Sequence, residues 1–299
     1  DKDALNKIRN IIDKIGSYEE AGFNRKASAP PKKDQKEIYG IIPRDRTKPY
    51  NIKDIIARLV DKSEFEEYKE EYGKSIVCGY ARIDGWAVGI VANQRTIIKN
   101  KKGEMQIGGV IYSDSADKST RFISNCNQKK IPLVFLQDVT GFMVGSRSEH
   151  GGIIKDGAKM VNAMANSVVP KFTVIIGNSY GAGNYAMCGK AYDPRLIVAW
   201  PTANLAVMGG EQAAKVLLEI EKSSLKSKGE LINEKKEKEL LKTIKTKYKK
   251  QTSPYYAAAN LWIDAIIDPL ETRKIISTGI EAANHAPIKE KYNPGIIQT

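Results

Sequence analysis

The stretch FTVIIGNSYGAGNYAM, residues 172–187, decides the fold of this chain. Residues 172–176 form an apolar, partly β-branched run typical of a buried strand, and the small residues behind it lead into a segment compatible with a helix. Glycine allows close approaches that a Cβ resists, and the first N–H groups of a helix have no partner inside the helix. The stretch therefore predicts either backbone donors for a developing anion or a tight turn packed against a neighbour.

The rest of the chain continues this alternation of strands and helices. The predicted strands lie near residues 76–83, 87–92, 133–137 and 196–200. The predicted helices lie near residues 52–59, 119–127, 153–167 and 211–221, with a short helix after Gly183. Strands interleaved with helices imply a layered α/β fold. Periodicity alone does not separate a spiral of ββα units from a doubly wound sheet.

Composition limits the kind of protein further. A chain of 299 residues that is 41% hydrophobic can bury a sizeable core as one large domain or two smaller ones. Its apolar runs all fall well short of the roughly 20 residues of a membrane span. Cys78, Cys126 and Cys188 are widely spaced and only His150 and His285 accompany them, so the sequence indicates neither a disulfide framework nor a metal site.

Further motifs follow one another along the chain. They are QDVTGFMVG at residues 137–145, GGIIKDGAKM at 151–160 and VMGGEQAA at 207–214. Together with the stretch at 172–187, they resemble the carboxyltransferase (beta) subunits of biotin-dependent acyl-CoA carboxylases. The resemblance covers most of the chain and is closest to the methylcrotonyl-CoA carboxylase type. It implies a crotonase-like (ClpP/crotonase) α/β fold, a spiral of ββα units.

The resemblance also implies how the chain is organised. Leu5, Ile8, Ile11, Ile12 and Ile15 form an apolar stripe at helical spacing ahead of a polar stretch. Residues 1–36 would be an amphipathic helix and linker from an N-terminal half, and residues 37–299 the C-terminal carboxyltransferase domain. The N-terminal half would then be a separate partner. Localisation would be the mitochondrial matrix in a eukaryote and the cytoplasm in a bacterium.

The family's chemistry assigns roles to residues of the glycine-rich turns. Ala182 and Gly183 match the pair whose amides bind the ureido oxygen of carboxybiotin, so these are the expected catalytic residues. The biotin nitrogen would then take the acyl-CoA proton, which would leave no need for a protein base. The remaining residues expected around biotin are Gly141, Phe142, Met143, Gly181 and Tyr185. For Phe142 and Met143, filling a gap in the core is an equally good interpretation.

Substrate and partners follow from the same resemblance. Arg82 is the candidate for the phosphates of acyl-CoA, although a surface arginine would explain it as well. Tyr185 favours 3-methylcrotonyl-CoA, since propionyl-type subunits tend to have aspartate there. The expected partners are a biotin carboxylase with its biotin carrier, the N-terminal half and further copies of the chain. A decarboxylase subunit with the same site, a crotonase-type hydratase and a noncatalytic assembly module are the alternatives.

The net positive charge of the chain agrees with binding of an acyl-CoA but does not select it over other anionic partners. The formal net charge of +13 would attract the phosphates of coenzyme A, an acidic partner or nucleic acid. Part of the excess lies in residues 222–250, which are rich in lysine with interspersed glutamate, as on a solvated helix. Aromatic residues for base stacking are not interleaved there, so nucleic-acid binding is not expected.

The sequence departs from the family's pattern at a few positions. Asn178 and Ala186 stand where related chains usually have glycine, and the loop at residues 94–107 is longer than expected. Both substitutions keep small or turn-tolerant residues, so they weaken the prediction of backbone donors only slightly.

Overall fold

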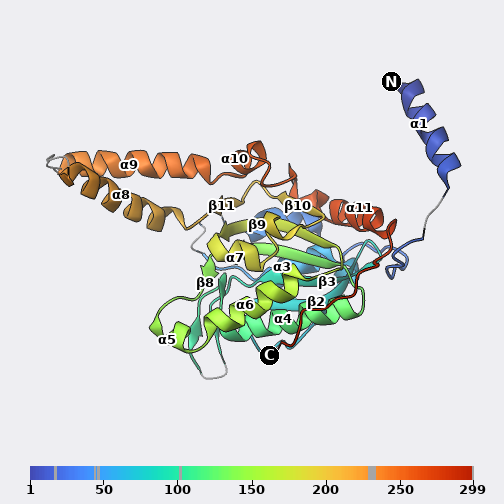
Figure 1. Ribbon diagram of the computed structural model, residues 1–299, viewed down its shortest axis with the longest axis horizontal. Helices are drawn as coiled ribbons and strands as arrows, with labels where there is room; N and C mark the ends of the chain where they lie inside the picture. Colours follow the sequence, from blue (N-terminus) through green and yellow to red (C-terminus); the bar gives the residue numbers. More distant parts are fainter. Residues whose placement is uncertain (17–18, 44, 46–47, 101–102, 228–233, 298–299) are drawn as a thin grey trace.

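A mostly parallel β-sheet forms the centre of the molecule. The computed structural model describes residues 1–16, 19–43, 45, 48–100, 103–227 and 234–297. Within these residues, eight strands join in one sheet in the order β1-β2-β3-β7-β9-β10-β12, with β11 also paired to β9 (Figure 1). The β1–β2 and β2–β3 pairs are antiparallel and the other pairs are parallel. The strands are β1 (Phe65–Glu67), β2 (Ile76–Ile83), β3 (Trp86–Asn93), β7 (Leu133–Val139), β9 (Lys171–Tyr180), β10 (Leu196–Ala199), β11 (Asn204–Ala206) and β12 (Ala265–Ile266).

Helices cover both faces of this sheet, which explains why its strands are almost continuously apolar. Side chains alternate between the faces of a strand. In β7, Val134 belongs to a core shared with α3 (Ile52–Leu59) and α11 (Thr272–Asn284), and Phe135 belongs to a core shared with α4 (Ser113–Gln128) and α6 (Ile153–Ala165). Parallel strands buried on both sides need such runs rather than alternation of polar and apolar residues.

The predicted elements are largely present, with small shifts at their ends. Helix α4 begins at Ser113 rather than near residue 119, and α6 ends at Ala165 rather than near 167. The short helix α7 (Gly181–Ala186) begins ahead of Gly183, because Gly181 itself takes the positive φ of +51° that opens it. Polar first turns carry little hydrophobic periodicity, so their bounds are hard to place from sequence.

The lysine-rich segment forms part of a helical hairpin that extends from the body of the molecule (Figure 1). Its helices are α8 (Gly210–Ser227) and α9 (Glu234–Gln251). Residues 228–233 of the predicted solvated helix lie outside the described residues. Lys222 of α8 pairs with Glu237 of α9 at 3.2 Å, a contact of oppositely charged side chains that suits a solvated pair of helices.

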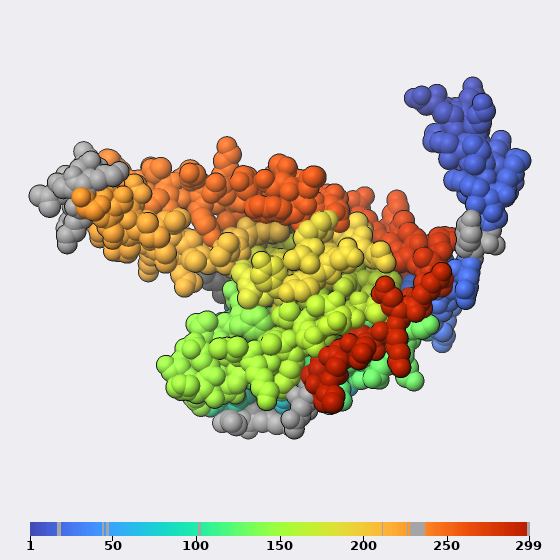
Figure 2. Space-filling model, in the orientation of Figure 1, coloured from blue at the N-terminus to red at the C-terminus, as the bar shows by residue number. Residues whose placement is uncertain are grey.

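The first helix, α1 (Lys2–Ile15), stands apart from the body, as Figure 2 shows. All of its residues are described and none is buried; Ile12, for example, is 60% exposed. Farther along, Phe23 packs into the main core and the backbone N–H of Ala21 donates to Asn284 O. Part of the predicted linker therefore lies on the domain, and the boundary at residue 36 remains a prediction.

The long loop after β3 folds as a small hairpin. Its strands are β4 (Ile98–Lys99) and β5 (Met105–Gln106), and residues 101–102 lie outside the described residues. Arg95 anchors the loop, since its Nη1 donates to Gly108 O and its Nε lies 3.5 Å from Asp138 at the end of β7. Through Arg95, this longer loop contacts the C-terminal end of β7, and helix α7 begins at the same end of the sheet.

The remaining elements connect these parts. Strand β6 (Val110–Ile111) pairs in parallel with β8 (Gly141–Phe142). The short helices are α2 (Ile38–Ile41), α5 (Ser146–His150) and α10 (Pro254–Ala259). Among the described residues, the helices are too short or too polar to cross a lipid bilayer.

Candidate functional site

The turn from β9 into α7 is the centre of the candidate site. Only glycine fits at its first position, because an added Cβ on Gly181 would lie 2.8 Å from the carbonyl oxygen of Val207 and the φ is positive. Tyr180 occupies the N-cap position, and its side chain does not cap the helix in the described structure. The amides of Ala182 and Gly183 belong to the first turn, whose N–H groups lack the usual i−4 partners. They are therefore positioned as donors.

A second glycine-containing segment packs against this turn. Gly183 is buried, and a Cβ added to it would lie 2.6 Å from Val139 Cγ2 and 3.1 Å from Gly141 Cα. Strand β8, which contains Gly141, thus lies directly beside α7. The structure brings together the two turns that the sequence singled out separately, and their missing side chains make this approach possible.

A pocket of about 770 Å³ opens next to α7; we call it the α7 pocket. Gly181, Ala182 and Tyr185 form one wall. The other residues that line it are mostly apolar or aromatic and include Val207, Met208, Val216, Leu217, Tyr248 and Trp262. Tyr185 is 48% exposed, and its ring makes an edge-to-face contact with that of Tyr192 at 5.9 Å. An apolar wall beside backbone donors suits a ligand with a polar reacting group and an apolar body.

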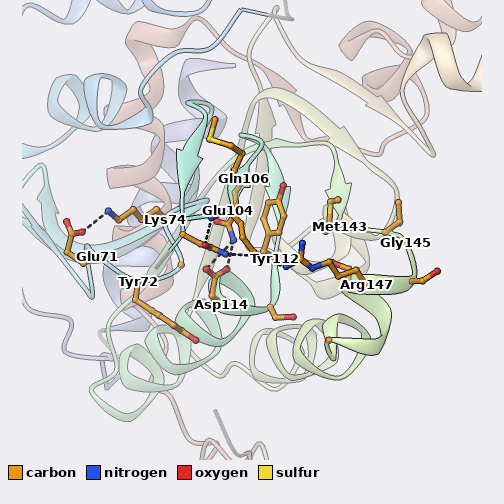
Figure 3. A pocket seen from close by; sticks show the side chains of 18 residues that line it. Glu71, Tyr72, Lys74, Glu104, Gln106, Tyr112, Asp114, Met143, Gly145 and Arg147 are labelled. Carbon is orange, nitrogen blue, oxygen red and sulfur yellow. Dashed lines mark hydrogen bonds and ion pairs between the residues drawn. The ribbon is translucent and has the colours of Figure 1, made fainter. Parts of the chain in front are cut away.

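A different pocket, of about 700 Å³, is the one drawn in Figure 3. Met143 and Gly145 line it, together with an ion pair between Glu104 and Arg147. Gln106 Nε2 donates to the Asp114 carboxylate at 3.2 and 3.3 Å in the same view. Met143 does not line the α7 pocket. Its role around biotin remains a prediction.

The ring of Phe142 packs against helix α6. A Cβ added to Gly157 of α6 would lie 2.7 Å from its ring, so the ring packs tightly on that helix. Phe142 also contacts the core formed with α4 and α6. This geometry supports the packing interpretation of Phe142, whereas Gly141, Gly181 and Tyr185 lie around α7.

Arg82 lies away from both pockets, near the end of β2. Its guanidinium donates to Gly85 O at 2.7 Å and to Asn24 Oδ1 at 2.5 Å, which ties the segment before α2 to the sheet. It lines a smaller cavity of about 400 Å³ together with Lys26 and Lys62. Phosphate binding by Arg82 remains a prediction, and these contacts give the residue a structural role.

Asp138, which the sequence did not single out as a functional residue, connects the ends of β7 and β9 next to the site. Asp138 is fully buried and accepts hydrogen bonds from Tyr50 Oη and from the backbone N–H of Asn178, both at 2.8 Å. Its charge lies 3.5 Å from Arg95 Nε. The signal was available, since a carboxylate directly behind an apolar strand must find partners once it is buried. Asp138 lies near the end of β7, and the contact of its carboxylate with Asn178 of β9 depends on the fold.

The cysteine nearest the site is not a nucleophile. Cys188 lies two residues after the end of α7 and is fully buried. Burial raises the pKa of its thiol to about 11. A thiolate is therefore scarce at neutral pH, which makes Cys188 unsuited to nucleophilic attack.

Antiparallel strands that lead into parallel strands wrapped by helices, with backbone donors behind a central strand, define the crotonase-like class of α/β folds. Residues 1–295 match the family described as the carboxyl transferase domain. The chain belongs to this family.

Similar proteins are beta subunits of biotin-dependent enzymes. The chain is 45% identical to a biotin-dependent 3-methylcrotonyl-coenzyme A carboxylase beta1 subunit of Mycobacterium tuberculosis, over 97% of the chain and 52% of that subunit. It is 43% identical to a mitochondrial methylcrotonoyl-CoA carboxylase beta chain of Dictyostelium discoideum, over 96% of the chain and 47% of the relative. A solved structure, the geranyl-CoA carboxylase beta subunit of P. aeruginosa, superposes with a TM-score of 0.76 at 37% identity, over 94% of the chain and 52% of the subunit. The chain spans about half the length of these relatives.

Proposed function

We propose that this chain is the part of an acyl-CoA carboxylase beta subunit that accepts carboxybiotin, and that it serves the transfer of a carboxyl group to an acyl-CoA. The observation that carries the proposal is the first turn of α7, where Ala182 and Gly183 present amides that no side chain caps in the described structure. Preorganised donors of this kind stabilise charge that develops in a transition state.

The residues of the turn fit the cofactor. Bound carboxybiotin supplies the carboxyl group and a ureido oxygen that becomes negative when the group leaves. The amides of Ala182 and Gly183 would donate to that oxygen. The turn has no room for a side chain at Gly181 or Gly183, because a Cβ added to either residue would lie within 2.8 Å of a neighbouring atom. Tight packing behind the donors prevents them from moving away as charge develops.

The α7 pocket supports a branched apolar acyl group as the second substrate. Its lining contains Val207, Val216 and Leu217, which would bury hydrocarbon. We propose 3-methylcrotonyl-CoA as the preferred acceptor. Identity to methylcrotonyl-type beta chains reaches 47%, against 38% to a putative propionyl-CoA carboxylase beta chain of Bacillus subtilis.

The relatives are about twice as long as this chain, which bears on the partners that it needs. We propose that an N-terminal half, a biotin carrier with its biotin carboxylase, and further copies of the chain complete the enzyme. In support, a similar solved structure, the transcarboxylase 12S subunit, is described as a hexamer, with a TM-score of 0.75 at 35% identity over 88% of this chain and 47% of the subunit. The compartment would be the mitochondrial matrix in a eukaryote and the cytoplasm in a bacterium; in support, the relative from Dictyostelium discoideum is mitochondrial.

The test is carboxyl transfer to free biotin from methylglutaconyl-, methylmalonyl- and malonyl-CoA. The chain is assayed alone and together with an N-terminal half. We expect transfer only when both halves are present, and the fastest transfer from methylglutaconyl-CoA. Fastest transfer from methylmalonyl-CoA would overturn the proposed acceptor, and the absence of transfer from all of them would overturn the proposed function. Copurification of a sodium-pump membrane subunit instead of a biotin carboxylase would favour the decarboxylase.

A further inference from the structure

A network of buried and half-buried side chains ties helix α7 to the ends of two strands. Asn184 Nδ2 donates to Ser179 Oγ at 2.7 Å, Ser179 Oγ donates to Gln137 Oε1 at 2.7 Å, and Gln137 Nε2 donates to Met187 O at 2.6 Å. These residues lie on β7, on β9, within α7 and directly behind α7. We call Gln137, Ser179 and Asn184 the Gln137 network.

The direction of every hydrogen bond in the network is fixed. Met187 O is a carbonyl and can only accept, so the amide nitrogen of Gln137 must face it. Gln137 Oε1 is then left to accept the Ser179 hydroxyl proton, and the lone pairs of Ser179 Oγ accept from Asn184. Only one arrangement of protons satisfies all these groups, so the network holds α7 in one orientation.

Burial makes these bonds costly to lose. The exposed fractions are 0% for Gln137 and 2% for Ser179. A buried polar group that loses its partner is destabilising, because water cannot replace the partner. Helix α7 has only six residues, too few to be stable by itself, and no side-chain cap in the described structure. Its orientation must come from contacts with the strands.

We infer that Gln137 and Ser179 are positioning residues for the amides of Ala182 and Gly183. Asn184 follows Gly183 directly, so the bond from Asn184 to Ser179 fixes the helical turn that carries the donor pair. On the opposite side, Gly183 packs on Val139 and Gly141. The network therefore holds the turn against the ends of the strands. The catalytic consequence of this inference rests on the proposed function.

The first test measures the order of the turn and needs no activity. Hydrogen exchange is followed in the peptide of residues 177–187, in the full chain, for wild type and for Ser179→Ala. We expect exchange about tenfold faster in the variant, the factor that corresponds to loss of one buried hydrogen bond. Ser119→Ala is the matched control, since Ser119 is equally buried on α4 and donates to Ser115 O within its own helix. Unchanged exchange in Ser179→Ala, or equal acceleration in the control, would overturn the inference.

The second test measures the consequence for catalysis in the complete enzyme. We expect Ser179→Ala and Gln137→Met each to lower kcat for carboxyl transfer about 100-fold with little change in KM for the acyl-CoA. The double variant should be no worse than the poorer single variant, because both break the same network. Additive losses or a change in KM alone would contradict a positioning role. If wild type shows no transfer, the proposed function fails, and the exchange measurement still decides whether the network orders the turn.

Discussion

At the scale of single residues, space beside Gly183 decides whether the donor turn can form. Gly183→Ala places a methyl group 2.6 Å from Cγ2 of Val139 at the end of β7, so α7 or the Val139 side chain must move. We expect a loss of about 1–3 kcal/mol in the free energy of unfolding, measured by urea titration. Carboxyl transfer should fall about 100-fold, since small displacements of donors have large effects.

The matched control is Gly40→Ala, because Gly40 on α2 has open space where its Cβ would lie. That variant should be neutral or more stable by up to about 1 kcal/mol. Equal behaviour of the two variants would show that Gly183 does not need to be glycine.

The buried cysteines give a second prediction at this scale. Burial raises the pKa of the Cys78 thiol to about 12 and that of Cys188 to about 11, and it also raises the pKa of Cys126. We expect the folded chain to react with Ellman's reagent at about pH 8 far more slowly than the chain in urea, in which all three thiols should react. Rapid labelling of the folded chain would contradict the burial of these side chains.

At the scale of elements, Asp84 holds α11 to the turn between β2 and β3. Ser277 of α11 donates to its carboxylate at 2.6 Å and Ser28 donates as well, and these hydrogen bonds lower the pKa of Asp84. A lowered pKa means that this stabilisation is present above the unfolded carboxyl pKa of about 4 and is lost as the pH falls through the folded value.

We therefore expect Asp84→Asn to be less stable than wild type by up to about 1 kcal/mol at about pH 7, a modest effect because the carboxylate is partly exposed. The difference should shrink as the pH falls below about 4. Asp13→Asn, an exposed substitution on α1, serves as the control and should follow wild type at every pH. A constant difference for Asp84→Asn would show that the hydrogen bonds do not depend on its charge.

At the scale of the whole molecule, the exposed apolar stripe of α1 is the most unusual feature. Ile8 and Ile12 are 52% and 60% exposed, so replacing both with lysine should change the free energy of unfolding of the chain by less than about 0.5 kcal/mol. By contrast, Ile56→Ala in α3, where Ile56 is 1% exposed, should cost about 2–5 kcal/mol.

The same double lysine variant should associate less in sedimentation experiments, because an apolar stripe of this kind favours contact with another surface. A large loss of stability in this variant would show that the stripe is buried in solution.

The sequence by itself determined the order of strands and helices and the position of the glycine-rich turns, because these depend on local patterns of apolar and small residues. The family followed from the resemblance of several motifs that occur in one order along the chain. Only the tertiary structure decided which distant residues meet. It placed Gly141 beside Gly183, joined Gln137 to Ser179, and separated Met143 and Arg82 from the α7 pocket. Such contacts depend on how the strands are ordered in the sheet and where their ends lie, and a pattern that repeats every few residues carries no information about either.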